Sequence, residues 1–181
     1  ANTAYEKCTN DPERETFKIP DYLQKMVDNE WLGQKSKQGF YKKIDKGVIH
    51  SIDLDTLEYT PQNKKRYAGV RLAKENVQLK DRLKALAYSD DPAGEFVWEV
   101  TAKALLYSAN RLGEIADDIV NIDRAMRWGF GWELGPFEAW DAIDVTKSIK
   151  RMKEENKQIP KWITEMLSTG NTSFYSRLEG F

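Results

Sequence analysis

Apolar and polar residues alternate with two different periods along the chain. From residue 62 onward apolar residues recur every three or four positions, a spacing that predicts amphipathic helices. Residues 40–44 and 48–52 predict the two strands of a β-hairpin, and a further short alternation follows over residues 54–59. The predicted fold class is therefore mainly α, with a small β-hairpin near residues 40–59.

Residues that commonly begin helices divide the helical part into segments. Asp91 and Pro92 combine an N-terminal cap with a proline at the first helical position. We expect the helix that they open to extend to about Ala116 and to be buried on more than one side, because apolar or small residues surround much of its circumference. Further helices are expected over residues 2–9, 20–33, 67–73, 79–87, 119–126 and 145–157, and after residue 160.

Residues 123–141 combine three glycines, one proline, three tryptophans and two phenylalanines. Glycines are common where the backbone adopts a positive φ or approaches another group closely, and aromatic residues between them supply apolar burial. This composition favours a tightly packed helix–loop–helix corner. A ligand site in the same stretch is the alternative.

Charge and cysteine content exclude several classes of function. The 28 Lys and Arg residues nearly balance the 29 Asp and Glu residues, which leaves no electrostatic footprint for nucleic acid or an anionic membrane. The single Cys8 excludes an intrachain disulfide and fits a reducing, cytoplasmic location, and no Cys/His spacing suggests a metal site. No apolar run approaches the ~18 residues of a membrane span.

Two features suggest chemistry but lack the partners that the chemistry needs. Residues 33–43 form a Gly/Lys/Ser loop of a kind that binds anions, but the P-loop spacing is absent, and a solvated turn is the favoured interpretation. His50 is the only histidine. No carboxylate, serine or cysteine accompanies it in a catalytic pattern, so it is a weak candidate.

The sequence contains an internal repeat. Residues 19–27 align with residues 159–167, with identical Ile, Pro and Met and matched apolar positions, and downstream Gly39-Phe40-Tyr41 resembles Ser173-Phe174-Tyr175. The repeat indicates that the chain holds the end of one helical repeat and nearly all of a second. We therefore predict a C-terminal remnant of the first helical repeat, a hairpin linker and a second helical repeat, over residues 1–43, 44–62 and 63–181.

Two groups of residues resemble signatures of one family. The first group follows the order Asp-Arg-Ala-Met, Gly-x-Gly, Gly-Pro-Phe-Glu and Asp, and it resembles the signature of the C-terminal helical domain of 3-hydroxyacyl-CoA dehydrogenases. Its characteristic members are Asp123, Gly129, Gly131, Gly135, Pro136, Phe137, Glu138 and Asp141. The second group resembles the Gly-x-Lys-x-x-x-Gly-Phe-Tyr element that closes the same domain. Its members are Gly33, Lys35, Gly39, Phe40 and Tyr41.

The resemblance implies a fold and an activity. It implies a helical domain with a fold like that of the C-terminal domain of 6-phosphogluconate dehydrogenase. It also implies the long bacterial form of 3-hydroxyacyl-CoA dehydrogenase, which carries two copies of this helical domain. The family comprises NAD-dependent oxidoreductases of fatty-acid β-oxidation that convert 3-hydroxyacyl-CoA to 3-ketoacyl-CoA. Its NAD site and catalytic pair belong to a dinucleotide-binding domain, and no Gly-x-Gly-x-x-Gly that follows a strand occurs in this chain.

We accordingly assign no catalytic, cofactor-binding or metal-binding residue to this chain, and we expect the family motifs to be structural. The expected partners are an N-terminal NAD-binding domain and a first helical repeat of the same polypeptide, with acyl-CoA as the substrate of the full-length enzyme. We expect the chain to be part of a longer protein and inactive alone. The alternatives are a helical protein-interaction or dimerisation module without metabolic activity, and retained acyl-CoA affinity through Lys35 or Lys37.

Two positions depart from the family pattern. Asn110-Arg111 resembles a catalytic Asn-Arg pair, but Glu114 follows it too closely, so we expect Asn110 to be a residue of the helix surface. Glu133 lies at or next to the position of a proline that the family has before its Gly-Pro pair. We therefore expect this second copy of the corner to have diverged from substrate contact.

Overall fold

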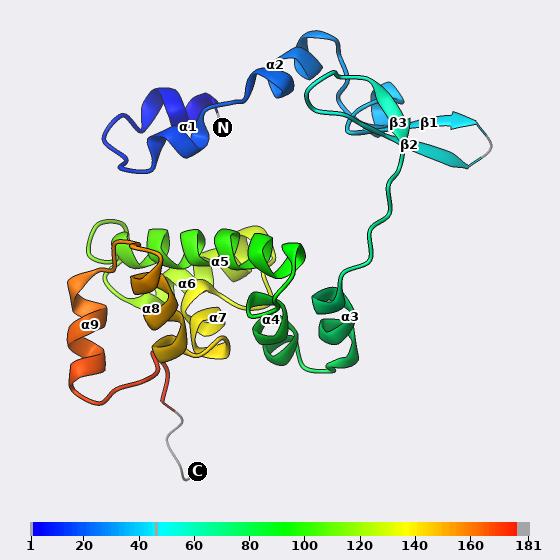
Figure 1. Cartoon of the computed structure of the whole chain (residues 1–181). Coiled ribbons are helices and arrows are strands. Elements are labelled where there is room, and N and C mark those ends of the chain that lie inside the picture. The colour runs from blue at the N-terminus through cyan, green and yellow to red at the C-terminus, as the bar shows by residue number, and fades with distance from the viewer. Residues whose placement is uncertain (1, 46, 177–181) are drawn as a thin grey trace. The chain divides into compact units, whose positions relative to one another are not determined.

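The computed structural model describes residues 2–45 and 47–176, and the chain forms two compact units. The N-terminal unit comprises residues 1–65 and the C-terminal unit comprises residues 66–181; each is described by itself. Within the described residues, helices predominate and a small antiparallel sheet accompanies them, so the predicted mainly α fold class is confirmed (Figure 1). The three regions inferred from the internal repeat stay a prediction.

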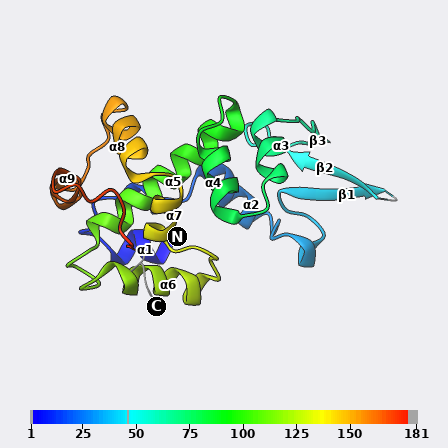
Figure 2. The same cartoon turned by 90° about the horizontal axis from the view of Figure 1, so that it is seen from below.

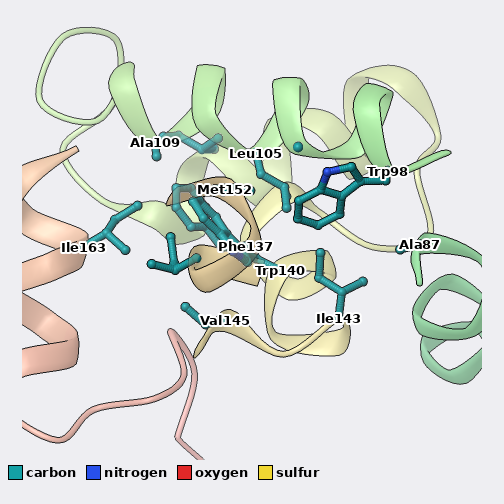
Figure 3. Close-up of a cluster of buried hydrophobic side chains, with 13 residues drawn as sticks. Ala87, Trp98, Leu105, Ala109, Phe137, Trp140, Ile143, Val145, Met152 and Ile163 are labelled. Carbon is teal, nitrogen blue, oxygen red and sulfur yellow. The ribbon is translucent and has the colours of Figure 1, made fainter. Parts of the chain in front are cut away.

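The C-terminal unit is a cluster of helices around one apolar core. Its helices are α3 (Ala68–Glu75), α4 (Leu79–Ala87), α5 (Pro92–Asn110), α6 (Ile119–Phe130), α7 (Pro136–Ala142), α8 (Val145–Glu154) and α9 (Lys161–Ser168). Figure 2 shows the short helix α7 between α6 and α8. The large aromatic side chains of the core come from α5 and α7 (Figure 3): they are Trp98, Phe137 and Trp140.

Helix α5 begins where the sequence predicts and ends earlier. The Asp91 carboxylate accepts hydrogen bonds from the backbone N–H groups of Ala93 and Gly94, as expected of an N-terminal cap. The helix ends at Asn110, before a turn in which Gly113 adopts a φ of 80°. One face is buried, at positions three or four residues apart: Trp98, Ala102, Leu105 and Ala109.

The expected burial of α5 on more than one side is wrong. Phe96 and Val100 are 69% and 53% exposed, because they lie on the face opposite the buried stripe. Small residues at Ala102 and Ala109 allow neighbouring helices to approach the buried face closely. Apolar composition alone did not reveal which side of the helix contacts the core.

A partly buried polar contact ties α5 to the end of α8. The indole Nε1 of Trp98 donates to Glu155 Oε1 at 2.7 Å, and Nε of Arg151 donates to the same oxygen at 2.8 Å. Burial alone would raise the pKa of Glu155, but these two hydrogen bonds and the charge of Lys157 together lower it.

We expect Glu155→Gln to lower the free energy of unfolding by about 1 kcal/mol at pH 7, because the charge-assisted hydrogen bonds become neutral ones. A lowered folded-state pKa contributes stability above the unfolded-state pKa, and that stability is lost as the pH falls through the folded-state value. The difference between wild type and variant should therefore shrink below about pH 4. Urea unfolding at pH 7, 5 and 3 measures it, and a difference that grows on acidification would contradict the assignment.

The N-terminal unit combines short helices with a three-stranded antiparallel sheet. The helical segments are α1 (Asn2–Lys7), η1 (Arg14–Phe17), α2 (Asp21–Asp28) and η2 (Gln34–Ser36), and the strands are β1 (Tyr41–Asp45), β2 (Val48–Ile52) and β3 (Tyr59–Pro61). The strands lie in the order β1-β2-β3, and the predicted hairpin is confirmed as β1 and β2. Helix α2 ends before the expected Gly33, because Glu30 adopts a left-handed conformation with a φ of 60°.

The alternation over residues 54–59 forms a turn for most of its length, and the third strand begins only at Tyr59. The Asp53 carboxylate explains the difference, since its Oδ1 accepts hydrogen bonds from the backbone N–H groups of Asp55 and Thr56. Such a side-chain-to-backbone turn competes with extended structure.

Among the described residues, no helix has both the length and the apolar character needed to cross a membrane.

Candidate functional site

The corner between α6 and α7 is built from two glycines in different roles. Gly131 ends α6 in a left-handed conformation, with a φ of 69°. Gly135 immediately precedes α7, and Pro136 occupies the first turn, where its missing N–H costs least. The backbone N–H of Gly135 donates to Glu138 Oε2 at 2.8 Å, so a side chain of the first turn reaches back to the start of α7.

Asp123 of α6 supplies the cap that Gly135 lacks. Its side chain is buried, and its two oxygens accept hydrogen bonds from the backbone N–H groups of Phe137 at 2.8 Å and Glu138 at 3.0 Å. These N–H groups belong to the first turn of α7, where no helical carbonyl is available to accept them. A carboxylate at this end also has a favourable interaction with the helix dipole.

We expect Gly135→Ala to lower the free energy of unfolding by about 1–3 kcal/mol, as overpacking of a closely packed contact does. A β-carbon at position 135 would lie 2.5 Å from the Cα of Asp123, a backbone atom that cannot rotate away. Gly129→Ala is the matched control, because a β-carbon there meets nothing within 4 Å. Thermal unfolding of the two variants measures the difference; equal melting temperatures would refute the close approach.

A returning C-terminal segment closes the corner. The backbone N–H groups of Phe174 and Tyr175 donate to the Asp141 carboxylate at 2.8 and 3.0 Å, and the hydroxyl of Tyr175 donates to Asp123 Oδ2 at 2.8 Å. We call these four residues, Asp123, Asp141, Phe174 and Tyr175, the clasp. It joins α6, α7 and the segment that follows α9 through two carboxylates.

Aromatic packing reinforces the clasp. The ring of Phe174 lies 5.0 Å from that of Phe137, 5.2 Å from that of Trp140 and 5.8 Å from that of Trp162, measured between centroids. These distances are typical of favourable aromatic pairs. Trp140 donates through Nε1 to the buried hydroxyl of Ser148 at 2.7 Å, which satisfies the polar atom of this ring.

Burial shifts the titration of the clasp. Desolvation raises the pKa of Asp123 and of Asp141, and the hydrogen bonds that each carboxylate accepts offset this only in part. Burial, and after it the hydrogen bond to Asp123 and its charge, raises the pKa of Tyr175. Because all four carboxylate oxygens accept hydrogen bonds from the protein, the arrangement is suited to holding a segment rather than to exchanging protons with a substrate.

The structure divides the first motif group into two sets. Asp123, Gly135, Pro136, Phe137, Glu138 and Asp141 lie together at the corner. Gly129 is exposed in the last turn of α6 and Gly131 ends that helix, so neither belongs to the clasp. Asn110, which we expected on the helix surface, is exposed at the last position of α5. His50, the weak catalytic candidate, lies in β2, and its Nδ1 is 3.3 Å from the Tyr59 carbonyl oxygen.

The second motif group lies in the N-terminal unit. Gly33 adopts a φ of 110°, and a β-carbon on Gly39 would lie 2.7 Å from the Cα of Gly33, so the two glycines allow a close backbone contact. Lys35 is exposed, and Phe40 and Tyr41 are 46% and 62% exposed.

Three contributors to the corner were not assigned to a site from the sequence. Phe174 and Tyr175 were noted only as the counterparts of Phe40 and Tyr41 in the internal repeat, and that match was the signal for their role. Arg127 was also missed; its Nη1 lies 3.0 Å from Glu138 Oε1 and forms an ion pair that braces the first turn of α7.

The fold and the clasp define a helical domain whose corner is closed by a returning Phe-Tyr segment. No family model matches the chain, and no solved structure matches it significantly. Curated proteins do match. The chain is 47% identical over 180 residues to "Probable 3-hydroxyacyl-CoA dehydrogenase" from Bacillus subtilis (strain 168), an alignment that covers 99% of this chain and 23% of that protein.

Two further relatives carry names from the same area of metabolism. The chain is 30% identical over 142 residues to "Putative fatty acid oxidation complex trifunctional enzyme" from Rickettsia felis, covering 76% of the chain and 17% of that protein. It is 25% identical over 150 residues to a protein of the same name from Rickettsia prowazekii, covering 77% of the chain and 19% of that protein. The chain thus spans about a quarter or less of the length of the relatives that it matches. The predicted resemblance to 3-hydroxyacyl-CoA dehydrogenases is confirmed.

Proposed function

We propose that the chain is the C-terminal part of an NAD-dependent 3-hydroxyacyl-CoA dehydrogenase, an enzyme that oxidises 3-hydroxyacyl-CoA to 3-ketoacyl-CoA in fatty-acid β-oxidation. One observation carries this proposal: the 47% identity over 99% of the chain to a protein named for that activity. NAD, the acyl-CoA substrate, a preceding NAD-binding domain and a first helical repeat all belong to the proposed longer protein. A cytoplasmic location is part of the same proposal.

The role of this part within the enzyme is structural. The carboxylates of Asp123 and Asp141 are engaged by backbone N–H groups and by the Tyr175 hydroxyl, which supports a packing role for the motif residues at the corner. In the N-terminal unit, Gly33 and Gly39 allow a close backbone contact, which supports the same role there. No residue of the chain is assigned to catalysis, to cofactor binding or to a metal.

The isolated chain should have no dehydrogenase activity. We expect no loss of NADH absorbance above background when the chain is mixed with NADH and acetoacetyl-CoA, because neither a nicotinamide site nor an acid–base pair is assigned to it. Heat-denatured chain serves as the control for background oxidation. Turnover above that control would refute the structural role.

A chimera tests the proposal for the longer protein. In the Bacillus subtilis relative, the matched segment is replaced by this chain, which aligns with it over 180 residues. We expect the chimera to retain NAD-dependent oxidation of a 3-hydroxyacyl-CoA substrate. The intact relative is the positive control, and a folded chimera without activity would count against the proposed function.

The second candidate is a helical interaction or dimerisation module without metabolic activity. Exposed aromatic side chains at the end of α6 favour it, since Trp128 and Phe130 are 77% and 74% exposed. Sedimentation equilibrium of the isolated chain distinguishes the two: a tight dimer that Trp128→Ala and Phe130→Ala dissociate would support the module. A monomer would favour the first candidate, in which the chain is a structural part of a longer dehydrogenase.

A further inference from the structure

The two copies of the Phe-Tyr pair have opposite surroundings. In the C-terminal unit, Phe174 packs against three aromatic rings and the hydroxyl of Tyr175 reaches the buried Asp123. In the N-terminal unit, the matching Phe40 and Tyr41 are 46% and 62% exposed. The same sequence element is therefore docked in one unit and undocked in the other.

The helices before the two pairs also correspond. The internal repeat aligns α2 with α9, each of which follows an Ile-Pro pair. Leu167 of α9 packs against the core of its unit, whereas its counterpart Val27 of α2 is 48% exposed. An exposed apolar residue on α2 and an exposed aromatic pair after it are what a docking element without its partner would present.

The fold of the N-terminal unit holds the exposed pair in place. The close contact between Gly33 and Gly39 fixes the turn before it, and the hydroxyl of Tyr59 donates to the Gly39 carbonyl oxygen. Tyr59 in turn packs edge-on against Trp31, with 5.8 Å between ring centroids. Phe40 thus directly precedes β1 and Tyr41 begins it, beside a surface hollow of about 720 Å³ that both residues help to line.

We propose that Phe40 and Tyr41 dock onto a second corner of the same construction as the clasp, elsewhere in the longer polypeptide. That corner would have a helix beginning at Gly-Pro, an aspartate to accept the hydroxyl of Tyr41, a second aspartate and an aromatic pocket for Phe40. The inference rests on the proposed function, because it requires a longer polypeptide with another helical repeat.

Charge and length both favour this occupant. Lys37 and Lys43 line the hollow beside the pair, whereas the corner of the C-terminal unit gathers the carboxylates of Asp123, Glu138 and Asp141, so a corner of that kind is complementary in charge. The matched segment makes up 23% of the Bacillus relative, so most of that protein lies outside it and has room for a second helical domain.

Nitration of tyrosine tests the docking without altering either pair. Tetranitromethane reacts with the phenolate, so the hydrogen-bonded Tyr175 should react slowly and the exposed Tyr41 about tenfold faster in the isolated chain. In the chimera with the Bacillus relative, we expect the rate at Tyr41 to fall about tenfold, toward that of Tyr175. Mass spectrometry of peptides resolves the two sites, and Tyr175→Phe confirms the assignment of the slow signal.

A second measurement uses Phe40→Ala, with Leu32→Ala as the matched control because Leu32 is also exposed, at 67%. Phe40→Ala should leave the melting temperature of the isolated chain unchanged and lower that of the chimera by about 2–4 °C, whereas Leu32→Ala should change neither. The docking is overturned if the chimera is active, Tyr41 is nitrated as fast as in the isolated chain, and Phe40→Ala does not change the melting temperature of the chimera. The proposed function would still stand in that case. Protection of Tyr41 in an inactive chimera supports the docking and counts against the proposed function.

Discussion

Asp123→Ala should lower the free energy of unfolding of the C-terminal unit by about 3–5 kcal/mol, because it removes the shared acceptor of several hydrogen-bond donors. The variant leaves three donors without their acceptor: the backbone N–H groups of Phe137 and Glu138 and the hydroxyl of Tyr175. Each unsatisfied buried donor costs about 1–3 kcal/mol, and the shortened side chain adds a small cavity. Urea unfolding followed by tryptophan fluorescence measures the loss.

Two comparisons isolate the contribution of the clasp. Asp118→Ala removes an exposed N-terminal cap from the same helix and should cost only about 1 kcal/mol. Tyr175→Phe in combination with Asp123→Ala should be less destabilising than the sum of the single variants, because both remove one shared hydrogen bond. Strictly additive effects, or an Asp123→Ala variant as stable as Asp118→Ala, would refute the clasp.

Local signals predicted the elements of the fold well. The Asp-Pro start of α5 was predicted from residues that commonly begin helices, and the Asp91 carboxylate accepts the expected N–H groups. The helix expected over residues 119–126 is present as α6, which the side chain of Asp118 caps in the same way. The hairpin of β1 and β2 was predicted from two alternating runs. These signals act over a few residues, so one sequence is enough to detect them.

Contacts between distant segments were not predictable in the same way. Asp123 caps α7 across 14 residues, and Tyr175 reaches Asp123 across 52. Neither spacing follows from a helical or strand period, because it depends on how the chain returns to the corner. The internal repeat and the family resemblance pointed to several residues that lie together at the corner, but the hydrogen bonds that connect them became visible only in three dimensions.

The same limit explains the error at α5. Its apolar residues occupy much of the helix circumference, and hydrophobicity alone does not distinguish a face that packs within the unit from one that is exposed on it. The exposed Phe96 and Val100 and the buried Trp98 and Leu105 alternate closely in sequence. Their difference is set by the position of α7 and α8, which the local pattern does not contain.

The core beneath the clasp should be as sensitive to truncation as the clasp itself. Trp140 is completely buried, lies 5.2 Å from the ring of Phe174 and donates to the hydroxyl of Ser148. Trp140→Ala should lower the free energy of unfolding by about 3–5 kcal/mol, through lost apolar burial and the cavity that remains. Trp128→Ala is the matched control: Trp128 is 77% exposed, and its loss should change the stability by no more than about 0.5 kcal/mol. Urea unfolding followed by far-ultraviolet circular dichroism compares the two variants, and similar midpoints would mean that the ring of Trp140 does not stabilise the corner.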